Sequence, residues 1–251
     1  MSTITSNGVK AYEAASHELT LPSSEPRPIL IIVMGPGSCG KSTIGESVSR
    51  ALHLPFVDGD SLHPQSNIDK MSSGTPLNDD DRLPWLALIR STAERVCKEQ
   101  WDKKEVHKRE EGGVGRAGVI IACSALKRWY RDILRGIGDA VPPPKDDLPI
   151  DHPHATSEKK AHKPATDNLL TLFLYCRGSR KLLEERISAR QGHFFGPKML
   201  DSQLAVLDDP VTSGEEGVAV VDIEGGKEDV ARRAEKAVKK LVGSEEERDR
   251  G

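Results

Sequence analysis

The chain has 251 residues, 36% hydrophobic and 30% charged, which suits one domain with polar additions better than two full domains. Its 36 Lys and Arg residues nearly balance 39 Asp and Glu residues, and a net charge of −3 gives no basic field that would favour nucleic acid or a membrane surface as partner. The longest apolar run, ILIIVM, is too short to span a membrane. Four widely spaced cysteines indicate reduced thiols in a cytoplasmic protein.

Strand and helix patterns alternate from residue 29 onward. Residues 1–28 are rich in Ser, Thr and Pro and are predicted to form a disordered arm. Apolar runs predict strands at 28–35, 54–60, 118–125, 169–176 and 217–225. Apolar stripes predict helices at 41–53, 85–101, 126–137, 179–191 and 228–242. This alternation predicts an α/β fold with a parallel five-stranded sheet, helices on both faces, and ligands at the carboxyl ends of the strands.

Three polar segments interrupt or follow the predicted domain, which covers residues 29–242. Segments 102–116 and 138–167 are too polar and too rich in Gly or Pro for a core, so we expect solvated insertions. The second contains His152, His154 and His162, but no cysteine accompanies them, and metal binding is the less favoured interpretation. Residues 243–251 are expected to form a frayed, charged tail.

The stretch GPGSCGKS, residues 35–42, satisfies two phosphate-binding patterns. Gly35, Gly37 and Gly40 fit the dinucleotide fingerprint, and an acid about 20 residues further on supports that interpretation. Gly35, Gly40, Lys41 and Ser42 fit the phosphate loop (P-loop) of nucleotide triphosphatases. The Lys-Ser pair and the basic residues downstream favour the P-loop, because the dinucleotide interpretation leaves them without a role.

A P-loop between a buried strand and a helix cradles phosphates with backbone N–H groups. Lys41 would then supply a charge to the β- and γ-phosphates of ATP, and Ser42 a hydroxyl to Mg²⁺. The loop residues predicted to contact ATP are Gly35, Pro36, Gly37, Ser38, Cys39, Gly40, Lys41, Ser42 and Thr43. Because Cys39 would lie beside the phosphates, we hypothesise that oxidation of its thiol changes the activity.

Two acids, Asp58 and Asp60, end the second predicted strand. One would hold Mg²⁺ and the other would accept a proton from a substrate hydroxyl; an ordinary Asp-Gly turn is the alternative. The third predicted strand ends without the acid that P-loop enzymes often carry there, so Asp58 would have to take the metal role. The stretch NDDDRLPW, residues 78–85, is equally consistent with a helix cap that places Pro84 in the first turn.

Four stretches together resemble, in order and spacing, the gluconokinases, P-loop kinases related to shikimate and nucleoside monophosphate kinases. They are GPGSCGKST (35–43), FVDGDSLHPQSNIDKMSSGTPLNDDDRLPWL (56–86), CSALKRWYRDILR (123–135) and RISARQGHFF (186–195). The resemblance spans about residues 29 to 241 and implies phosphorylation of D-gluconate at its 6-hydroxyl by ATP with Mg²⁺. The products would be 6-phosphogluconate and ADP, and the resemblance also implies a homodimer.

The resemblance also implies roles for individual residues. Asp60 would orient and deprotonate the hydroxyl, and Lys41 and Arg190 would complete the catalytic set. The candidates for binding gluconate are Asp60, His63, Arg82, Lys127 and Arg131. Arg82 is the favoured partner of the gluconate carboxylate because a guanidinium binds it in a bidentate fork. As alternatives, His63 belongs to a turn, and Lys127 and Arg131 form an exposed basic helix face.

Residues 179–200 resemble the mobile lid of these kinases. Arg186 and Arg190 lie one helical turn apart and would reach the triphosphate when the lid closes, unless they pair with Glu on the same helix. His193, Phe194 and Phe195 would shield the site from water or pack the lid onto the core. Two other functions stay open: a kinase for another small hydroxylated acid, such as a shikimate-like acceptor, and a regulatory protein that binds ATP without catalysis.

Overall fold

The computed structural model describes residues 26–103, 113–149, 169–189 and 197–250. Nearly all of the predicted arm and much of both predicted insertions lie outside these ranges, as do the three histidines of the second insertion. Residues 190–196 of the predicted lid also lie outside them, and these include Arg190, His193, Phe194 and Phe195.

A five-stranded parallel sheet forms the centre of the molecule, with the strand order β2-β3-β1-β4-β5. Its strands are β1 (Ile29–Met34), β2 (Phe56–Asp58), β3 (Gly118–Ala122), β4 (Leu170–Arg177) and β5 (Val218–Asp222). The run ILIIVM is the middle strand, and all six of its residues are fully buried. This burial explains why the run shows no polar alternation, because both of its faces are covered.

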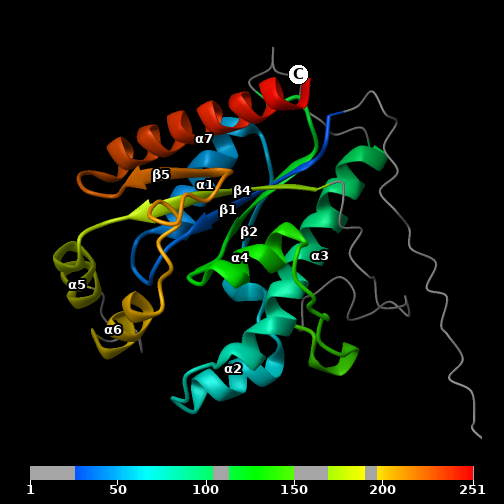
Figure 1. Ribbon diagram of the computed structural model, residues 1–251. Helices are drawn as coiled ribbons and strands as arrows, with labels where there is room; N and C mark the ends of the chain where they lie inside the picture. Colours follow the sequence, from blue (N-terminus) through cyan, green and yellow to red (C-terminus); the bar gives the residue numbers. More distant parts are fainter. Residues whose placement is uncertain (1–25, 104–112, 150–168, 190–196, 251) are drawn as a thin grey trace, which may run out of the picture.

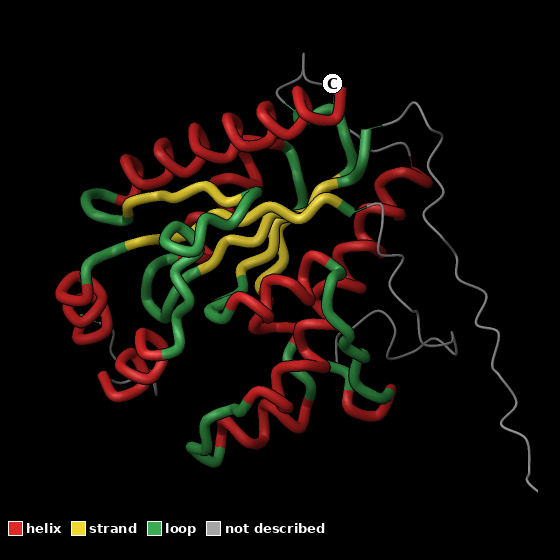
Figure 2. The backbone as a smooth tube through the Cα atoms, in the orientation of Figure 1, coloured by secondary structure: helices red, strands yellow, loops and turns green. Residues whose placement is uncertain are grey.

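Helices cover both faces of the sheet (Figures 1 and 2). Helices α1 (Lys41–Leu52) and α7 (Lys227–Arg250) pack on one face, and α3 (Asp79–Lys103) and α4 (Arg128–Arg135) on the other. Successive residues of β1 point to opposite faces, so Ile31 joins the core beneath α1 and α7, while Ile32 joins the core beneath α3 and α4. The predicted fold class is therefore confirmed.

Some short helical elements of the described residues were not predicted from the sequence. They are η1 (Gly59–Leu62), α2 (Gln65–Ser72), η3 (Lys145–Asp147) and α6 (Pro197–Ala205). Helix α5 (Arg180–Ser188) matches the predicted lid helix. Figure 1 shows α5 and α6 beyond the end of the sheet to which the arrowheads of β4 and β5 point, which is the carboxyl edge. Ligands of parallel α/β folds bind at this edge.

Helix α3 begins at Asp79, six residues before the predicted start. The Asn78 side chain accepts a hydrogen bond from the Asp81 N–H at 2.9 Å, and the Asp81 carboxylate accepts one from the Asn78 N–H at 2.6 Å. This reciprocal pair is a capping box, so the cap interpretation of the acidic stretch is confirmed. Pro84 is the sixth helical residue and does not lie in the first turn.

The described residues add detail to two other expectations about polar segments. Helix α7 continues to Arg250, so the tail expected to fray is helical, because helix-forming Glu and Arg residues extend a helix that Val238 and Val242 anchor in the core. In the second predicted insertion, Asp147 accepts hydrogen bonds from the Ser66 N–H at 2.7 Å and the Ser66 hydroxyl at 2.6 Å. That part of the insertion is docked on the start of α2 and is not simply solvated.

Across the described ranges, no helix combines the length and apolar composition needed to cross a membrane.

Candidate functional site

The P-loop connects β1 to α1 at the carboxyl edge of the sheet. Gly35, Ser38 and Gly40 have positive φ angles of 142°, 62° and 94°. A Cβ atom on Gly35 would lie 2.9 Å from the carbonyl oxygen of Cys176, so only glycine fits there. Gly40 is the N-cap of α1 and offers no side chain to the N–H groups of its first turn. Those N–H groups and the helix dipole therefore make a site for phosphate.

Two polar groups of this loop are paired within the protein. The Lys41 ammonium donates to the carbonyl oxygens of Gly35 at 3.1 Å and Pro36 at 3.0 Å. The Gly37 N–H donates to the side-chain oxygen of Gln203 on α6 at 2.6 Å. A bound phosphate oxygen would take over these donors. No signal in the sequence pointed to Gln203, which lies 166 residues from its partner.

The acid pair lies directly against the P-loop. Asp58 ends β2, and one of its oxygens accepts from the Ser42 hydroxyl at 2.7 Å while the other accepts from the Asp60 N–H at 3.0 Å. A Cβ on Gly59 would lie 2.3 Å from the Ala122 carbonyl oxygen, so the turn between the acids needs glycine. The fold thus joins Ser42, Asp58 and Asp60, as the sequence predicted.

The oxygen donors at this point fit Mg²⁺. Ser42 and Asp58 offer a hydroxyl and a carboxylate, and Mg²⁺ is usually held by one or two such groups together with waters and substrate phosphates. The described part of the chain contains no group of three or more His, Cys, Asp or Glu side chains that could form an all-protein metal cage. A site completed by a nucleotide agrees with both observations.

The Asp60 carboxyl has a raised pKa. Partial burial is the main cause, the negative charge of Asp58 adds to it, and the positive charge of Lys41 opposes both. A carboxylate with a raised pKa is a better proton acceptor than an ordinary one. Asp60 therefore lies beside the P-loop and is more basic than an ordinary aspartate.

His63 is buried and stacks on Trp85, with the ring centroids 4.2 Å apart. Burial, and then the charge of Arg82, lowers the pKa of His63 to about 4, so the ring is neutral at pH 7. The Trp85 indole donates to the Gly59 carbonyl at 2.8 Å and so attaches the turn between Asp58 and Asp60 to α3. This packing supports the turn interpretation of His63, and its contact with substrate stays a proposal.

A second polar cluster lies at the start of α3 and includes Lys127 and Arg82. The Lys127 ammonium binds both carboxylate oxygens of Asp79, at 2.7 and 2.8 Å, and the Tyr130 hydroxyl donates to the same carboxylate. These bonds, that of Lys127 first, lower the pKa of Asp79, and the charge of Arg82 contributes. The Asp79 side chain is 45% exposed and that of Lys127 is 24% exposed. Lys127 therefore belongs to a cluster that a solvent-borne carboxylate could enter.

Arg82 donates from one guanidinium nitrogen to the carbonyl oxygens of Leu77 at 2.6 Å and Asn78 at 3.0 Å. These bonds place its positive charge over the start of α3, where it acts on His63, Asp79 and Tyr130. Arg82 belongs to the cluster around Lys127, and Trp85 holds the turn between Asp58 and Asp60. Because Arg82 and Trp85 are three residues apart on α3, one helix turn connects that cluster to the acid pair. Tyr130 and Asp79 were missed as site residues, since helix propensity and capping already explained them.

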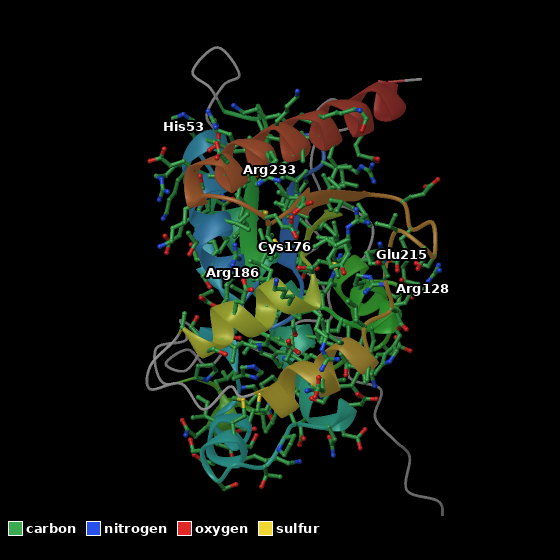
Figure 3. The ribbon with its side chains drawn as sticks, turned by 90° about the vertical axis from the view of Figure 1, so that its left-hand side faces the viewer. His53, Arg128, Cys176, Arg186, Glu215 and Arg233 are labelled. Carbon is green, nitrogen blue, oxygen red and sulfur yellow. The ribbon has the colours of Figure 1, made fainter. Side chains whose placement is uncertain are left out.

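The structure contradicts the assignment of Arg131 to substrate binding. Its side chain is 0% exposed, and its guanidinium pairs with Glu215. The remaining donors bind the carbonyl oxygens of Ala125, Leu126 and Asp208 at 2.9 to 3.0 Å. All five N–H groups of an arginine are used by these partners. Figure 3 shows Glu215 beside Arg128 of α4, to one side of the P-loop. Arg131 holds the 206–217 loop and is neither a ligand nor an exposed basic residue.

Arg131→Met is expected to lower the free energy of unfolding by about 3 to 5 kcal/mol, because it leaves the buried Glu215 with only Arg135 as charged partner. Urea unfolding measures the loss. Although burial opposes ionisation, the bonds and charges of both arginines lower the pKa of Glu215 to about 2. Its stabilising contribution is therefore present at neutral pH and is lost as the pH falls from about 4.5 toward 2. If Arg131→Met left the free energy of unfolding unchanged but weakened binding of the acceptor, Arg131 would again be a candidate for substrate binding.

Arg186 connects the P-loop to the end of β5. Its guanidinium donates to the carbonyl oxygens of Cys39 at 3.2 Å and Ile223 at 2.8 Å, and the described contacts do not pair it with a Glu of its own helix. Figure 3, which looks from the side where α5 and α6 lie, shows Arg186 and Cys176 close together near the middle of the molecule. Arg186 is thus placed beside the P-loop as expected. Arg190 lies outside the described residues.

Comparison with known proteins gives consistent relatives, although no family model matches the chain. The chain is 34% identical over 221 residues to a probable gluconokinase of Schizosaccharomyces pombe, covering 88% of this chain and 93% of that protein. It is also 34% identical to the thermoresistant gluconokinase of Escherichia coli, covering 84% and 94%. Among solved structures, a gluconokinase from Sinorhizobium meliloti 1021 aligns with a TM-score of 0.59 and 34% identity, covering 88% of this chain and 97% of that one.

Proposed function

Because the chain belongs to the gluconokinase family, we propose that it transfers the γ-phosphoryl group of ATP to the 6-hydroxyl of D-gluconate, giving 6-phospho-D-gluconate and ADP. The observation that carries the proposal is the contact series from Ser42 through Asp58 to Asp60. It joins a P-loop that can bind a nucleotide to an acid that can activate a hydroxyl.

The P-loop binds the triphosphate in this proposal. Backbone N–H groups of the loop and the first turn of α1 bind phosphate oxygens, and Lys41 exchanges its two carbonyl partners for the β- and γ-phosphates. Arg186 is positioned to add positive charge, because its guanidinium already contacts the Cys39 carbonyl. Arg190 is proposed to do the same from the family resemblance alone.

Ser42 and Asp58 are the residues that would hold Mg²⁺. When bound, the ion neutralises phosphate charge and helps to align the γ-phosphoryl group. Asp60 then orients the acceptor hydroxyl and takes its proton as the oxygen attacks phosphorus. The contacts support this division of work, because Asp58 already binds the Ser42 hydroxyl and the Asp60 N–H.

We assign the gluconate carboxylate to the cluster of Lys127, Arg82 and Tyr130. The Asp79 carboxylate is bound by Lys127 and Tyr130, and these contacts support the proposal that the cluster can bind a carboxylate. A substrate carboxylate would share or replace Asp79 in these contacts. His63 is proposed to contact the sugar-acid chain as a neutral ring, in agreement with its lowered pKa.

Arg82→Ala tests the carboxylate assignment. It is expected to raise the KM for gluconate by roughly 10- to 100-fold, since a hydrogen bond to a charged group contributes about 1.5 to 3 kcal/mol. The KM for ATP should stay near the wild-type value, and steady-state kinetics with each substrate varied measures both. Lys98→Ala is the matched control, because Lys98 lies on the same helix, paired with Asp102 at the surface. A raised KM for ATP with an unchanged KM for gluconate would reassign Arg82.

ADP release with Mg·ATP and a panel of acceptors tests the proposed reaction. The panel contains D-gluconate, other aldonates, shikimate and nucleoside monophosphates. Turnover on gluconate is expected. Turnover on another acceptor alone would support a related small-molecule kinase, and none on any acceptor, with ATP bound, would support a regulatory ATP-binding protein. The raised pKa of Asp60 favours catalysis, since a sensor has no need of a proton acceptor.

Further parts of the proposal concern domain organisation and cellular setting. A single kinase domain at residues 29–242 that acts in the cytoplasm agrees with four buried cysteines that form no disulfide. The family resemblance supports a homodimer, and the net charge of −3 gives no basic field that would favour a nucleic acid or membrane partner. Sedimentation of the full chain with and without Mg·ATP measures the oligomeric state.

A further inference from the structure

Two buried cysteines meet beneath the P-loop. Cys39 belongs to the loop itself and Cys176 lies near the carboxyl end of β4. A Cβ built on Gly35 would lie 3.0 Å from the Cys39 sulfur and 3.5 Å from the Cys176 Cβ. Both cysteines therefore border the space that a side chain at position 35 would fill, and the glycine lets them approach each other.

The two side chains lie side by side, so that the Cys176 thiol can donate a hydrogen bond to the Cys39 sulfur. This bond is the main cause that lowers the pKa of Cys39 to about 6, against the effect of burial, and the charges of Lys41 and Arg186 add to it. The same contact and burial raise the pKa of Cys176. By contrast, burial raises the pKa of Cys97 and of Cys123 to about 12. Among the described cysteines, Cys39 is thus the one whose thiol ionises most readily, and a second thiol lies beside it.

We propose that Cys39 and Cys176 form a reversible disulfide that switches off nucleotide binding at the P-loop. Formation of the bond needs the two neighbouring sulfurs and an oxidant, and it does not depend on the proposed function. The effect on nucleotide rests on the proposed function, in which this loop binds ATP. Nothing in the P-loop pattern itself requires cysteine at either position.

The oxidant we assign is a small hydroperoxide, because both sulfurs are buried and a bulky reagent could not reach them. The Cys39 thiolate attacks one oxygen of hydrogen peroxide, the O–O bond breaks, and the released hydroxide takes up a proton as water. The Cys176 sulfur loses its proton and attacks the sulfenic sulfur of Cys39, which releases the second oxygen as water. Two thiols thereby lose two electrons and two protons, and one hydrogen peroxide becomes two waters.

The disulfide would move the loop because a sulfur–sulfur bond of about 2.05 Å is much shorter than a hydrogen-bonded contact between thiols. Cys39 would be drawn toward β4, and its carbonyl oxygen, which accepts from Arg186, would move with it. The N–H groups of the loop would then leave the positions that phosphate needs. We expect nucleotide affinity to fall by roughly 100-fold, since a displacement of about 1 Å in a pre-organised site can have that effect.

The test treats the full chain with hydrogen peroxide and uses two readouts. Mass spectrometry of a non-reducing digest should find the Cys39 and Cys176 peptides joined. Binding of a fluorescent ATP analogue should weaken and recover with dithiothreitol, and Mg·ATP added before the peroxide should slow the linkage. If untreated protein fails to bind the analogue, the proposed function fails, while the peptide map still decides on the disulfide.

Cys176→Ala should show no linked peptide and no loss of binding that dithiothreitol reverses. Cys97→Ala is the matched control, a buried cysteine on α3 outside the pair, and should behave as wild type. If Cys176→Ala does not fold, Cys176→Ser is used in its place. If neither variant folds, the peptide map of the wild-type protein alone decides whether the disulfide forms. The proposal is overturned if peroxide-treated wild type lacks the joined peptides, or if Cys176→Ala keeps the reversible loss of binding.

Discussion

Lys41→Ala is expected to lower kcat by about 10³-fold or more, because it removes the ammonium that we propose binds the β- and γ-phosphates when charge shifts in the transition state. Lys41 bonds to the carbonyl oxygens of Gly35 and Pro36 within its own loop, and a phosphate would take its ammonium from them. The measurement is ADP release at saturating Mg·ATP and gluconate.

The loss must be separated from damage to the loop, since Lys41 also supports the loop through those two bonds. Lys41→Arg keeps the charge and should recover part of the activity, while circular dichroism and thermal unfolding should be close to wild type for both variants. Turnover of Lys41→Ala within about tenfold of wild type would contradict the phosphate role, because a pre-organised charge contributes more than that.

Asp60→Asn is expected to lower kcat by roughly 10²-fold or more, because asparagine fills the same space without accepting a proton. The pH profile adds a second readout. The raised pKa of Asp60 predicts that wild-type kcat/KM falls as the pH drops through that pKa, when the base becomes protonated. The acidic limb should disappear in the variant.

Asp69→Asn is the control for Asp60. Asp69 is an exposed acid on the neighbouring helix α2, where it accepts from the Gln65 side chain at 2.7 Å. Its substitution should leave both kcat and the pH profile unchanged. An Asp60→Asn enzyme with full activity and an intact acidic limb would remove Asp60 from the mechanism and leave only its turn structure.

The central part of the fold was predictable because local patterns determine it. The run at residues 29–34 is apolar on both faces, which only a central strand can bury, and the glycines of the P-loop meet positive φ angles at Gly35 and Gly40. The spacing of Asp58 and Asp60 placed both acids at a strand end. Since parallel strands present their carboxyl ends at one edge, the contact between Asp58 and Ser42 followed.

The other parts depend on contacts that are distant in sequence. Lys127 and Arg131 are four residues apart, and helical spacing predicts one common face without saying whether it meets solvent or a loop. Arg131 is buried because Glu215, 84 residues away, folds back onto α4. Gln203 and the Cys176 partner of Cys39 likewise come from segments that reach the P-loop only in the folded chain.

The helical tail and α2 were missed for a different reason. The tail sequence GSEEERDRG contains no apolar residue, and Asn67 is the buried residue of α2, so periodicity gave no signal. The described tail is helical because its Glu and Arg residues continue a helix that is already anchored, and α2 packs with Asn67 as its buried residue. Asn67 donates to the Asp81 carbonyl at 2.8 Å, a polar contact that hydrophobic patterning does not detect.

The most direct test of the proposed reaction is phosphorus NMR of the product formed from Mg·ATP and D-gluconate. Transfer to the 6-hydroxyl predicts a new phosphomonoester whose phosphorus couples to the two protons on C6, formed in amounts equal to ADP and absent with Lys41→Ala. A phosphomonoester at another carbon, or ADP release without any phosphorylated gluconate, would contradict the account.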